Sequence, residues 1–111
     1  MLLQELPREV KSALTELKQE LQRMYGSRLQ GVYLYGSYAR GDFHEDSDVD
    51  VLVVLEGPVN VSTEASRYSG VVSDICLRYD LLIATIPISD QLLAEGTEPL
   101  LDNVRREGVR V

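Results

Sequence analysis

The stretch GSYARGDFHEDSDVD, residues 36–50, lies between two segments with the character of β-strands. Residues 31–35 are rich in β-branched and aromatic side chains and predict the first strand. Residues 48–55 predict the second, and the apolar run in their later half indicates burial on both faces of a sheet. Between the strands we expect a brief helix over residues 37–40 and a polar loop over residues 42–47. The stretch therefore carries the chain from one strand to another.

Segments with helical periodicity flank these strands. Residues 7–25 predict an amphipathic helix, because apolar residues recur there every three or four positions. Residues 62–78 predict a second long helix, residues 80–86 a third strand, and residues 90–94 and 99–106 two short helices. The resulting order, α-β-α-β-α-β-α, predicts the α/β (α+β) class, in which a small sheet is flanked by helices.

The composition is that of an ordinary globular chain. Of 111 residues, 44% are hydrophobic and 26% are charged, so we expect one domain over residues 1–111. The single cysteine, Cys76, excludes an internal disulfide framework and fits a reducing cytoplasm. We expect no signal peptide and no membrane partner, because no segment approaches the roughly 20 apolar residues of a membrane span.

The charge balance excludes one class of partner. Eleven basic residues against eighteen acidic ones give a net charge of −7. Non-specific nucleic-acid binding depends on basic residues that displace counterions, so direct binding to nucleic acid is not expected. Binding of a single nucleotide through metal ions stays open, because a metal ion reverses the local charge.

Gly36-Ser37 joins the first strand to the brief helix. A helix N-terminus offers unpaired amide groups to a phosphate, glycine allows close approach of the backbone, and the Ser37 hydroxyl adds a donor. A tight turn with an N-cap serine has the same sequence. Taken alone, the pair does not decide between a phosphate site and a turn.

Asp48 and Asp50 are two residues apart at the start of the second strand. Because side chains alternate across a strand, both carboxylates point to the same face, with Cα atoms about 6.5–7 Å apart. Two such carboxylates repel each other unless a cation lies between them, and they suit a pair of Mg²⁺ ions. A solvated strand start is the alternative. A calcium loop is excluded, because Val51 and Gly57 stand where its glycine and glutamate are required.

Asp80 is the candidate third carboxylate. It opens the predicted third strand, as Asp48 opens the second, so parallel pairing of the two strands would bring them together. An acidic group there could bind one metal ion and help to remove a proton from an attacking hydroxyl. Asp74 is the rival, but it lies inside the predicted helix. We therefore expect Asp48, Asp50 and Asp80 to converge on the metal ions.

The combined motif resembles the nucleotidyltransferase domain of the DNA polymerase beta superfamily, and above all the minimal nucleotidyltransferases of prokaryotes. That pattern is Gly-Ser, ten residues, then Asp-x-Asp, which Gly36-Ser37, residues 38–47 and Asp48-Val49-Asp50 match without a gap. Ala39-Arg40-Gly41 and the C-terminal segment 99–109 also look typical of the family. The resemblance implies the nucleotidyltransferase fold, with a small mixed sheet flanked by helices.

The resemblance also implies an activity: Mg²⁺-dependent transfer of AMP, or another nucleoside monophosphate, from ATP or another nucleoside triphosphate to a hydroxyl. Gly36, Ser37 and Arg40 would contact the triphosphate, and two Mg²⁺ ions would lie on Asp48, Asp50 and Asp80. The family implies a small helical partner of the HEPN type, a toxin that this chain, as antitoxin, would modify on a tyrosine. The alternative is a non-catalytic antitoxin that neutralises its partner by occlusion. Association of this chain with further copies of itself stays an open alternative.

Four further side chains could have either a functional role or an ordinary structural one. Arg40 could neutralise phosphate or merely cap the short helix. His44, the only histidine, is expected to be a solvated loop residue, and Cys76 a buried helix residue. For Tyr38, beside the Gly-Ser turn, stacking on a nucleotide base stays an open alternative.

Overall fold

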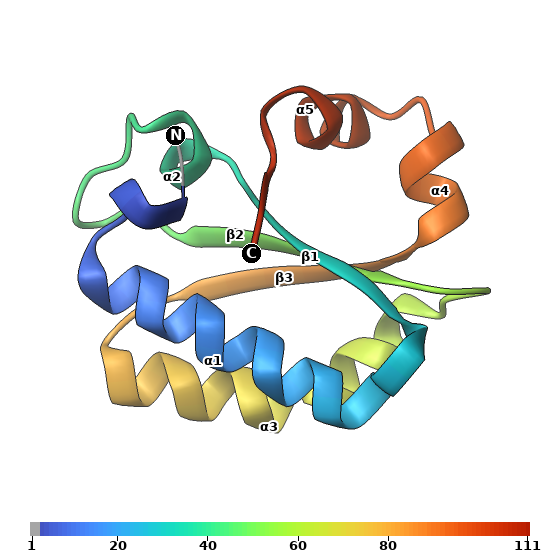
Figure 1. The fold of residues 1–111 in the computed structure, drawn as a ribbon, viewed down its shortest axis with the longest axis horizontal. Helices are drawn as coiled ribbons and strands as arrows, with labels where there is room; N and C mark the ends of the chain where they lie inside the picture. The colour runs from blue at the N-terminus through green and yellow to red at the C-terminus, as the bar shows by residue number, and fades with distance from the viewer. Residues whose placement is uncertain (1–2) are drawn as a thin grey trace.

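The computed structural model describes residues 3–111, and a four-stranded sheet lies at its centre (Figure 1). The strands lie in the order β3-β2-β1-β4. β2 pairs antiparallel with β1 and parallel with β3, and β1 pairs antiparallel with β4, so the sheet is mixed. Their bounds are Leu29–Tyr35 for β1, Val49–Leu55 for β2, Ile83–Ser89 for β3 and Val109–Arg110 for β4.

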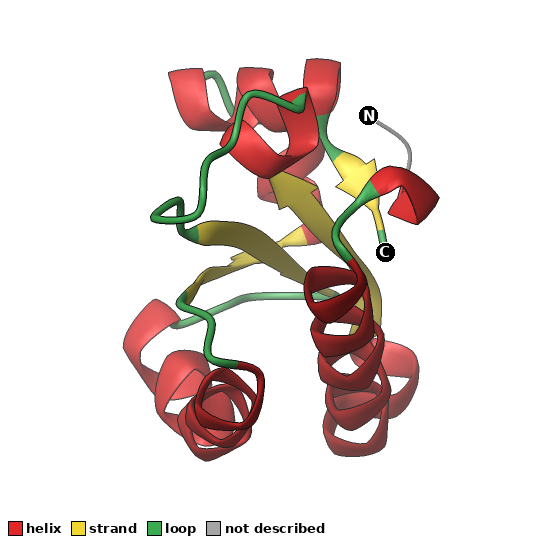
Figure 2. Ribbon diagram, turned by 90° about the vertical axis from the view of Figure 1, so that its left-hand side faces the viewer, coloured by secondary structure: helices red, strands yellow, loops and turns green. Residues whose placement is uncertain are grey.

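Two long helices, α1 (Arg8–Tyr25) and α3 (Val61–Tyr79), cover one face of the sheet (Figure 2). α1 begins directly after Pro7, whose missing amide is no loss in a first turn, and Gly26 ends it with a φ of +56°. The side chain of Asn60 caps α3 by accepting a hydrogen bond from the Thr63 amide. The larger of the two apolar clusters lies here and includes the following residues of α1 and β2: Val10, Leu14, Leu17, Leu21, Val49, Val51, Val53 and Leu55.

Short helices lie over the opposite face (Figure 1). They are α2 (Ser37–Arg40), α4 (Asp90–Glu95) and α5 (Pro99–Glu107), and two 3-10 turns, η1 (Leu3–Glu5) and η2 (Gly26–Arg28), flank α1. The smaller apolar cluster joins Leu52 and Val54 of β2 to Ile88, Leu101 and Val104. β2 is thus buried on both faces, as its apolar run predicts.

The expected order of elements is confirmed through α5, with two differences at the third strand. The strand starts at Ile83 rather than residue 80, and it continues past Pro87 to Ser89. The Val49 amide donates to the Leu82 carbonyl, so by alternation the Pro87 nitrogen faces the open edge, where no ladder hydrogen bond is lost. β4 was not expected, because two residues carry no periodicity. Within residues 3–111, no helix is long and apolar enough to span a membrane.

Candidate functional site

The Gly36 turn and the Asp50 carboxylate are packed directly against each other. Gly36 has a φ of +76°, and a Cβ atom built there would overlap Asp50 Oδ2 and lie 3.3 Å from Asp50 Cγ. The contact arises because Tyr35, the residue before the turn, pairs with Asp50 in the antiparallel β1–β2 ladder. The two ends of the 36–50 stretch therefore meet in space, and a side chain at position 36 would be strained at this φ and would displace the Asp50 carboxylate.

The negative charges of Asp48 and Asp50 lie close enough for one to affect the pKa of the other. Asp50 is half-buried and Asp48, one residue before β2, is exposed. Burial raises the pKa of Asp50, the negative charge of Asp48 raises it further, and Arg40 opposes both effects. Burial, followed by the charge of Asp50, also raises the pKa of Tyr35. A cation placed beside Asp48 and Asp50 would relieve this repulsion, so the pair fits a divalent metal ion.

The aspartates lie at the open end of the sheet face that α5 covers. Asp50 shares that face with Leu52 and Val54, which pack against Leu101 and Val104 of α5. Ala84, the β3 residue opposite Asp50, is exposed, so no helix covers the sheet at this point.

α2 presents its first turn beside the aspartates. Its short ladder runs from the Arg40 amide to the Gly36 carbonyl (3.1 Å) and from the Gly41 amide to the Ser37 carbonyl (2.9 Å). The Ser37 amide lies before the first of these hydrogen bonds and donates to neither of them. The Ser37 hydroxyl makes no hydrogen bond to any residue of the described chain. Both groups are placed to serve as donors to an oxygen ligand.

Arg40 and Tyr38 point in different directions. Arg40 is exposed and forms ion pairs with Asp42 (3.1 Å) and with Glu107 of α5 (3.6 Å), and the hydrogen bond to Asp42 raises its pKa. Tyr38 is buried, and its ring stacks on Phe43 with centroids 4.3 Å apart. Tyr38 is thus a core residue and not a free surface for base stacking.

The structure corrects the expectation for Asp80. Asp80 does not open β3: it is the C-cap of α3, in the left-handed conformation with φ 53° and ψ 49°, and β3 starts three residues later. It is exposed and lines a hollow of about 360 Å³ with Val10, Phe43 and Tyr79, on the side of α1 and α3. Among residues 3–111, no three Asp, Glu, His or Cys side chains are placed to hold one metal ion. Asp80 does not group with Asp48 and Asp50 in this structure, and its role as a third metal ligand stays a prediction.

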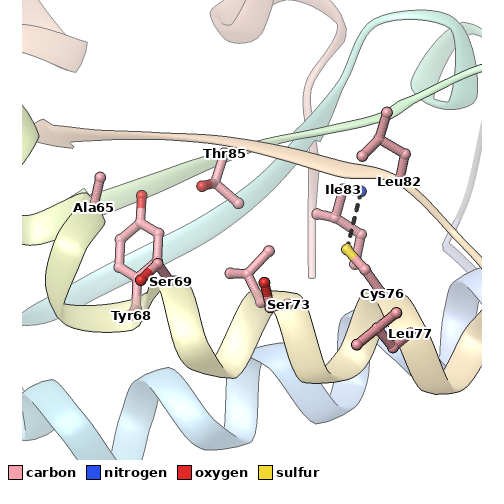
Figure 3. A pocket seen from close by; sticks show the side chains of 10 residues that line it. Ala65, Tyr68, Ser69, Ser73, Cys76, Leu77, Leu82, Ile83 and Thr85 are labelled. Atoms are coloured by element: carbon pink, nitrogen blue, oxygen red, sulfur yellow. Dashed lines mark hydrogen bonds between the residues drawn. The ribbon is translucent and has the colours of Figure 1, made fainter.

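The remaining candidates have structural partners. Asp74 pairs with Arg78 one turn along α3 (3.0 Å), and His44 is exposed in the loop, as expected. Cys76 lies half-buried on α3 beside a second hollow, of about 460 Å³, between α3 and β3 (Figure 3). Its Sγ accepts a hydrogen bond from the Ile83 amide (3.3 Å), which fits the expected structural role.

Two neighbours of the site gave no signal in the sequence. Tyr35 reaches Asp50 only through strand register, and Glu107 reaches Arg40 only because α5 folds back over the sheet. Both contacts join residues that lie 15 or more positions apart, so local pattern does not encode them.

The glycine turn packed on Asp50 thus lies at one end of a mixed sheet between helices. The family model described as "Nucleotidyltransferase domain" matches residues 14–95, so the chain belongs to this family. The resemblance to its minimal members is confirmed by the relatives that follow.

One relative is similar over almost its whole length. The "Putative protein adenylyltransferase MJ0141" of Methanocaldococcus jannaschii is 32% identical over 103 residues, which are 93% of this chain and 99% of the relative. The similarity therefore extends over nearly the whole of both chains.

Two solved structures share the fold. A toxin–antitoxin complex with AMP-PNP is similar over 94% of this chain and 72% of that one, with a TM-score of 0.62 and 20% identity. The complex of a tri-AMPylated HEPN toxin from Shewanella oneidensis with its MNT antitoxin is similar over 88% of this chain and 70% of that one, with a TM-score of 0.52 and 15% identity. At these identities the likeness establishes the nucleotidyltransferase fold.

Proposed function

We propose that this chain is a protein adenylyltransferase, which transfers AMP from ATP to a hydroxyl, a tyrosine of a HEPN-type toxin, and so acts as the antitoxin of the pair. The contact between Gly36 and Asp50 carries the proposal, because it joins a close-approach turn to a half-buried carboxylate whose pKa is raised by burial and by the charge of Asp48. The adenylyltransferase relative and the fold of an AMPylating antitoxin support this choice of substrate and partner.

The chain's own residues have separate roles in this proposal. Asp48 and Asp50 would hold Mg²⁺, while the Gly36 backbone, the Ser37 hydroxyl and the Arg40 guanidinium contact the triphosphate. When bound, Mg²⁺ neutralises charge on the phosphate oxygens. The acceptor oxygen forms a bond to the α-phosphorus as the bond to the bridging oxygen breaks, pyrophosphate leaves, and the hydroxyl proton passes to solvent.

Neutralisation by occlusion is the second candidate. Its support is the net charge of −7, which favours contact with a basic surface without any chemistry. The two candidates differ in one property: occlusion does not need the aspartate pair, whereas transfer does.

The first test replaces both aspartates. The chain is incubated with ATP labelled at the α-phosphate, Mg²⁺ and the product of the neighbouring gene. We expect label on the partner with the natural chain, and a rate lowered at least about a hundredfold in Asp48→Asn with Asp50→Asn, because the charges that hold the metal are gone. The matched control is Asp46→Asn, an exposed acid in the same loop, which should keep the natural rate.

Growth of cells that express the partner separates the two candidates. If the double variant binds the partner and still restores growth fully, occlusion is the function. Absence of label with the natural chain, or equal label with the double variant, overturns the transferase proposal.

A further inference from the structure

A hollow of about 360 Å³ shares part of its lining with the segment that carries the proposed active site. The start of α1, the loop between α2 and β2, and the end of α3 line it, and all three lie toward the left of Figure 1. Two of its lining residues, Tyr38 and Phe43, belong to the 36–50 stretch, which also carries Gly36 and the aspartates. The hollow and the proposed active site are therefore built in part from the same stretch of chain.

The lining combines aromatic rings with acidic side chains. Phe43 and Tyr79 are half-buried, so the hollow has ring surface that solvent reaches. Its charged residues come from three separate segments and are all exposed acids: Glu9, Glu45 and Asp80. Because no Lys or Arg is among the described residues that line it, the hollow is an apolar pocket with a negative rim.

The three acids of this rim have no partners of opposite charge. Within residues 3–111, none of the three carboxylates forms an ion pair or a hydrogen bond. Arg78, the basic residue nearest in sequence to Asp80, pairs instead with Glu16 (2.9 Å) and Asp74 (3.0 Å). No three acids of the described chain are placed to hold one metal ion. A cation that relieves the repulsion around this rim is therefore larger than a metal ion and carries several hydrogen-bond donors.

We propose that this hollow receives an arginine side chain of the acceptor protein. The inference rests on the proposed function and adds to it the group by which the acceptor is held. A guanidinium stacks on aromatic faces and offers five donors to carboxylates, so it can use the rings and the acids together. A lysine ammonium is a compact, strongly hydrated point charge, which matches the acids but not the ring faces. The volume is near the lower end of the roughly 300–1,000 Å³ of ligand pockets, which suits one long side chain.

The position of the hollow lets one acceptor protein reach both sites. Glu45 precedes Asp48 by three residues, so at most about 11 Å of extended chain separates them. An arginine in the hollow and a hydroxyl beside the aspartates can therefore belong to one surface of the acceptor. Such an anchor contributes equally before and during the chemical step, so it lowers the KM for the acceptor and leaves kcat unchanged.

The test measures AMP transfer from ATP, with Mg²⁺, to increasing concentrations of the product of the neighbouring gene. The variant combines Glu9→Gln with Glu45→Gln and keeps Asp80, whose predicted role as a metal ligand would obscure the result. We expect the KM for the acceptor to rise at least about tenfold, because the guanidinium loses two charged partners. The kcat and the KM for ATP should stay within about twofold of the natural values.

The matched control removes the same amount of charge outside the hollow. Glu56→Gln with Glu95→Gln replaces two exposed acids, one directly after β2 and one at the end of α4. This control should leave the KM for the acceptor within about twofold, which separates the hollow from general steering by the net charge. Tyr79→Leu removes one ring without changing the charge and should raise the same KM about threefold or more. Melting temperatures show that each variant is folded.

Substitutions in the acceptor protein identify the side chain that binds. Each arginine of the neighbouring gene's product is replaced by glutamine in turn. One of these changes should raise the KM as much as the Glu9–Glu45 variant does. It should add little when combined with that variant, because both remove the same interaction.

Four results overturn the inference. The Glu9–Glu45 variant could keep its KM for the acceptor, the control could raise that KM equally, the KM for ATP could rise instead, or a lysine of the acceptor could take the place of the arginine. If the natural chain transfers no AMP, the proposed function fails, and calorimetric titration with the acceptor alone then tests the hollow. In that titration the Glu9–Glu45 variant should bind the acceptor at least about tenfold more weakly than the control does, and equal binding overturns the inference.

Discussion

The backbone of Gly36 and the carboxylate of Asp50 occupy neighbouring volumes, so the identity of one residue limits the other. Gly57 offers a comparison within the same chain. It also has a positive φ, +81°, but a Cβ atom there would meet no atom within 4 Å. A comparison of substitutions at these two glycines therefore separates the effect of backbone strain from the effect of the contact with Asp50.

Alanine at these two positions should have different effects. Both Gly36→Ala and Gly57→Ala should lower the free energy of unfolding by about 1–2 kcal/mol, because an L-residue is strained at positive φ. Only Gly36→Ala should abolish AMP transfer, since its methyl group displaces the Asp50 carboxylate. Urea denaturation and the AMP-transfer assay measure these effects. Full AMP transfer by Gly36→Ala would contradict the role given to the contact.

At the scale of elements, a buried carboxylate joins α1, η2 and α3. Glu64, in the first turn of α3, is 5% exposed. It accepts hydrogen bonds from the Tyr25 hydroxyl (3.0 Å) and from Arg28 (3.1 Å). Burial alone would raise the pKa of Glu64, but these bonds and the charges of Arg28 and Arg67 outweigh it and lower that pKa. The carboxylate therefore stays ionised and holds the two helices together.

Tyr25 makes this link sensitive to alkali. Burial and the hydrogen bond to Glu64 raise the pKa of Tyr25 from 10.0 to about 12, so the folded chain favours the neutral phenol. The stabilisation is complete below pH 10, the pKa in the unfolded chain, and is lost as the pH rises toward about 12. We expect the free energy of unfolding to fall by about 2 kcal/mol more in the natural chain than in Tyr25→Phe over this range.

Urea denaturation at several pH values checks this expectation. Near neutral pH, Tyr25→Phe should already be about 1–2 kcal/mol less stable, because Glu64 loses one of its donors. The stability curves of the two proteins should then converge as the pH rises. Parallel curves from neutral pH to pH 12 would show that Tyr25 does not contribute this pH dependence.

Across the whole molecule, β2 connects the two apolar clusters. Its odd-numbered side chains pack against α1 and α3, and its even-numbered ones, such as Leu52, pack against α5. A single sheet therefore carries both halves of the core, and the site lies at one end of that sheet. Loss of packing on either face should unfold the other face as well.

Leu17→Ala and Leu52→Ala test this, one on each face. Both side chains are fully buried, so each substitution should lower the free energy of unfolding by about 2–5 kcal/mol. In both variants, circular dichroism and tyrosine fluorescence should report one coincident transition. Two separate transitions, or a loss confined to one probe, would show that the faces are independent.

The sequence by itself determined the order of the helices and of the first three strands, the two-sided burial of β2, and the glycine turn with an aspartate pair on one face. These features follow from periodicity and local conformation, which a few neighbouring residues encode. Local pattern did not determine where α3 ends, because Asp80 tolerates the left-handed conformation that caps a helix as readily as it starts a strand.

Only the tertiary structure decided which residues surround the aspartates. The register that sets Ala84 beside Asp50 joins residues 34 positions apart, and the Arg40–Glu107 ion pair joins residues 67 positions apart. Such contacts depend on how helices of both layers pack on a shared sheet, since a one-residue shift of β3 would turn its side chains to the other face. The same packing puts Asp80 at the C-terminal end of α3 instead of at the start of β3.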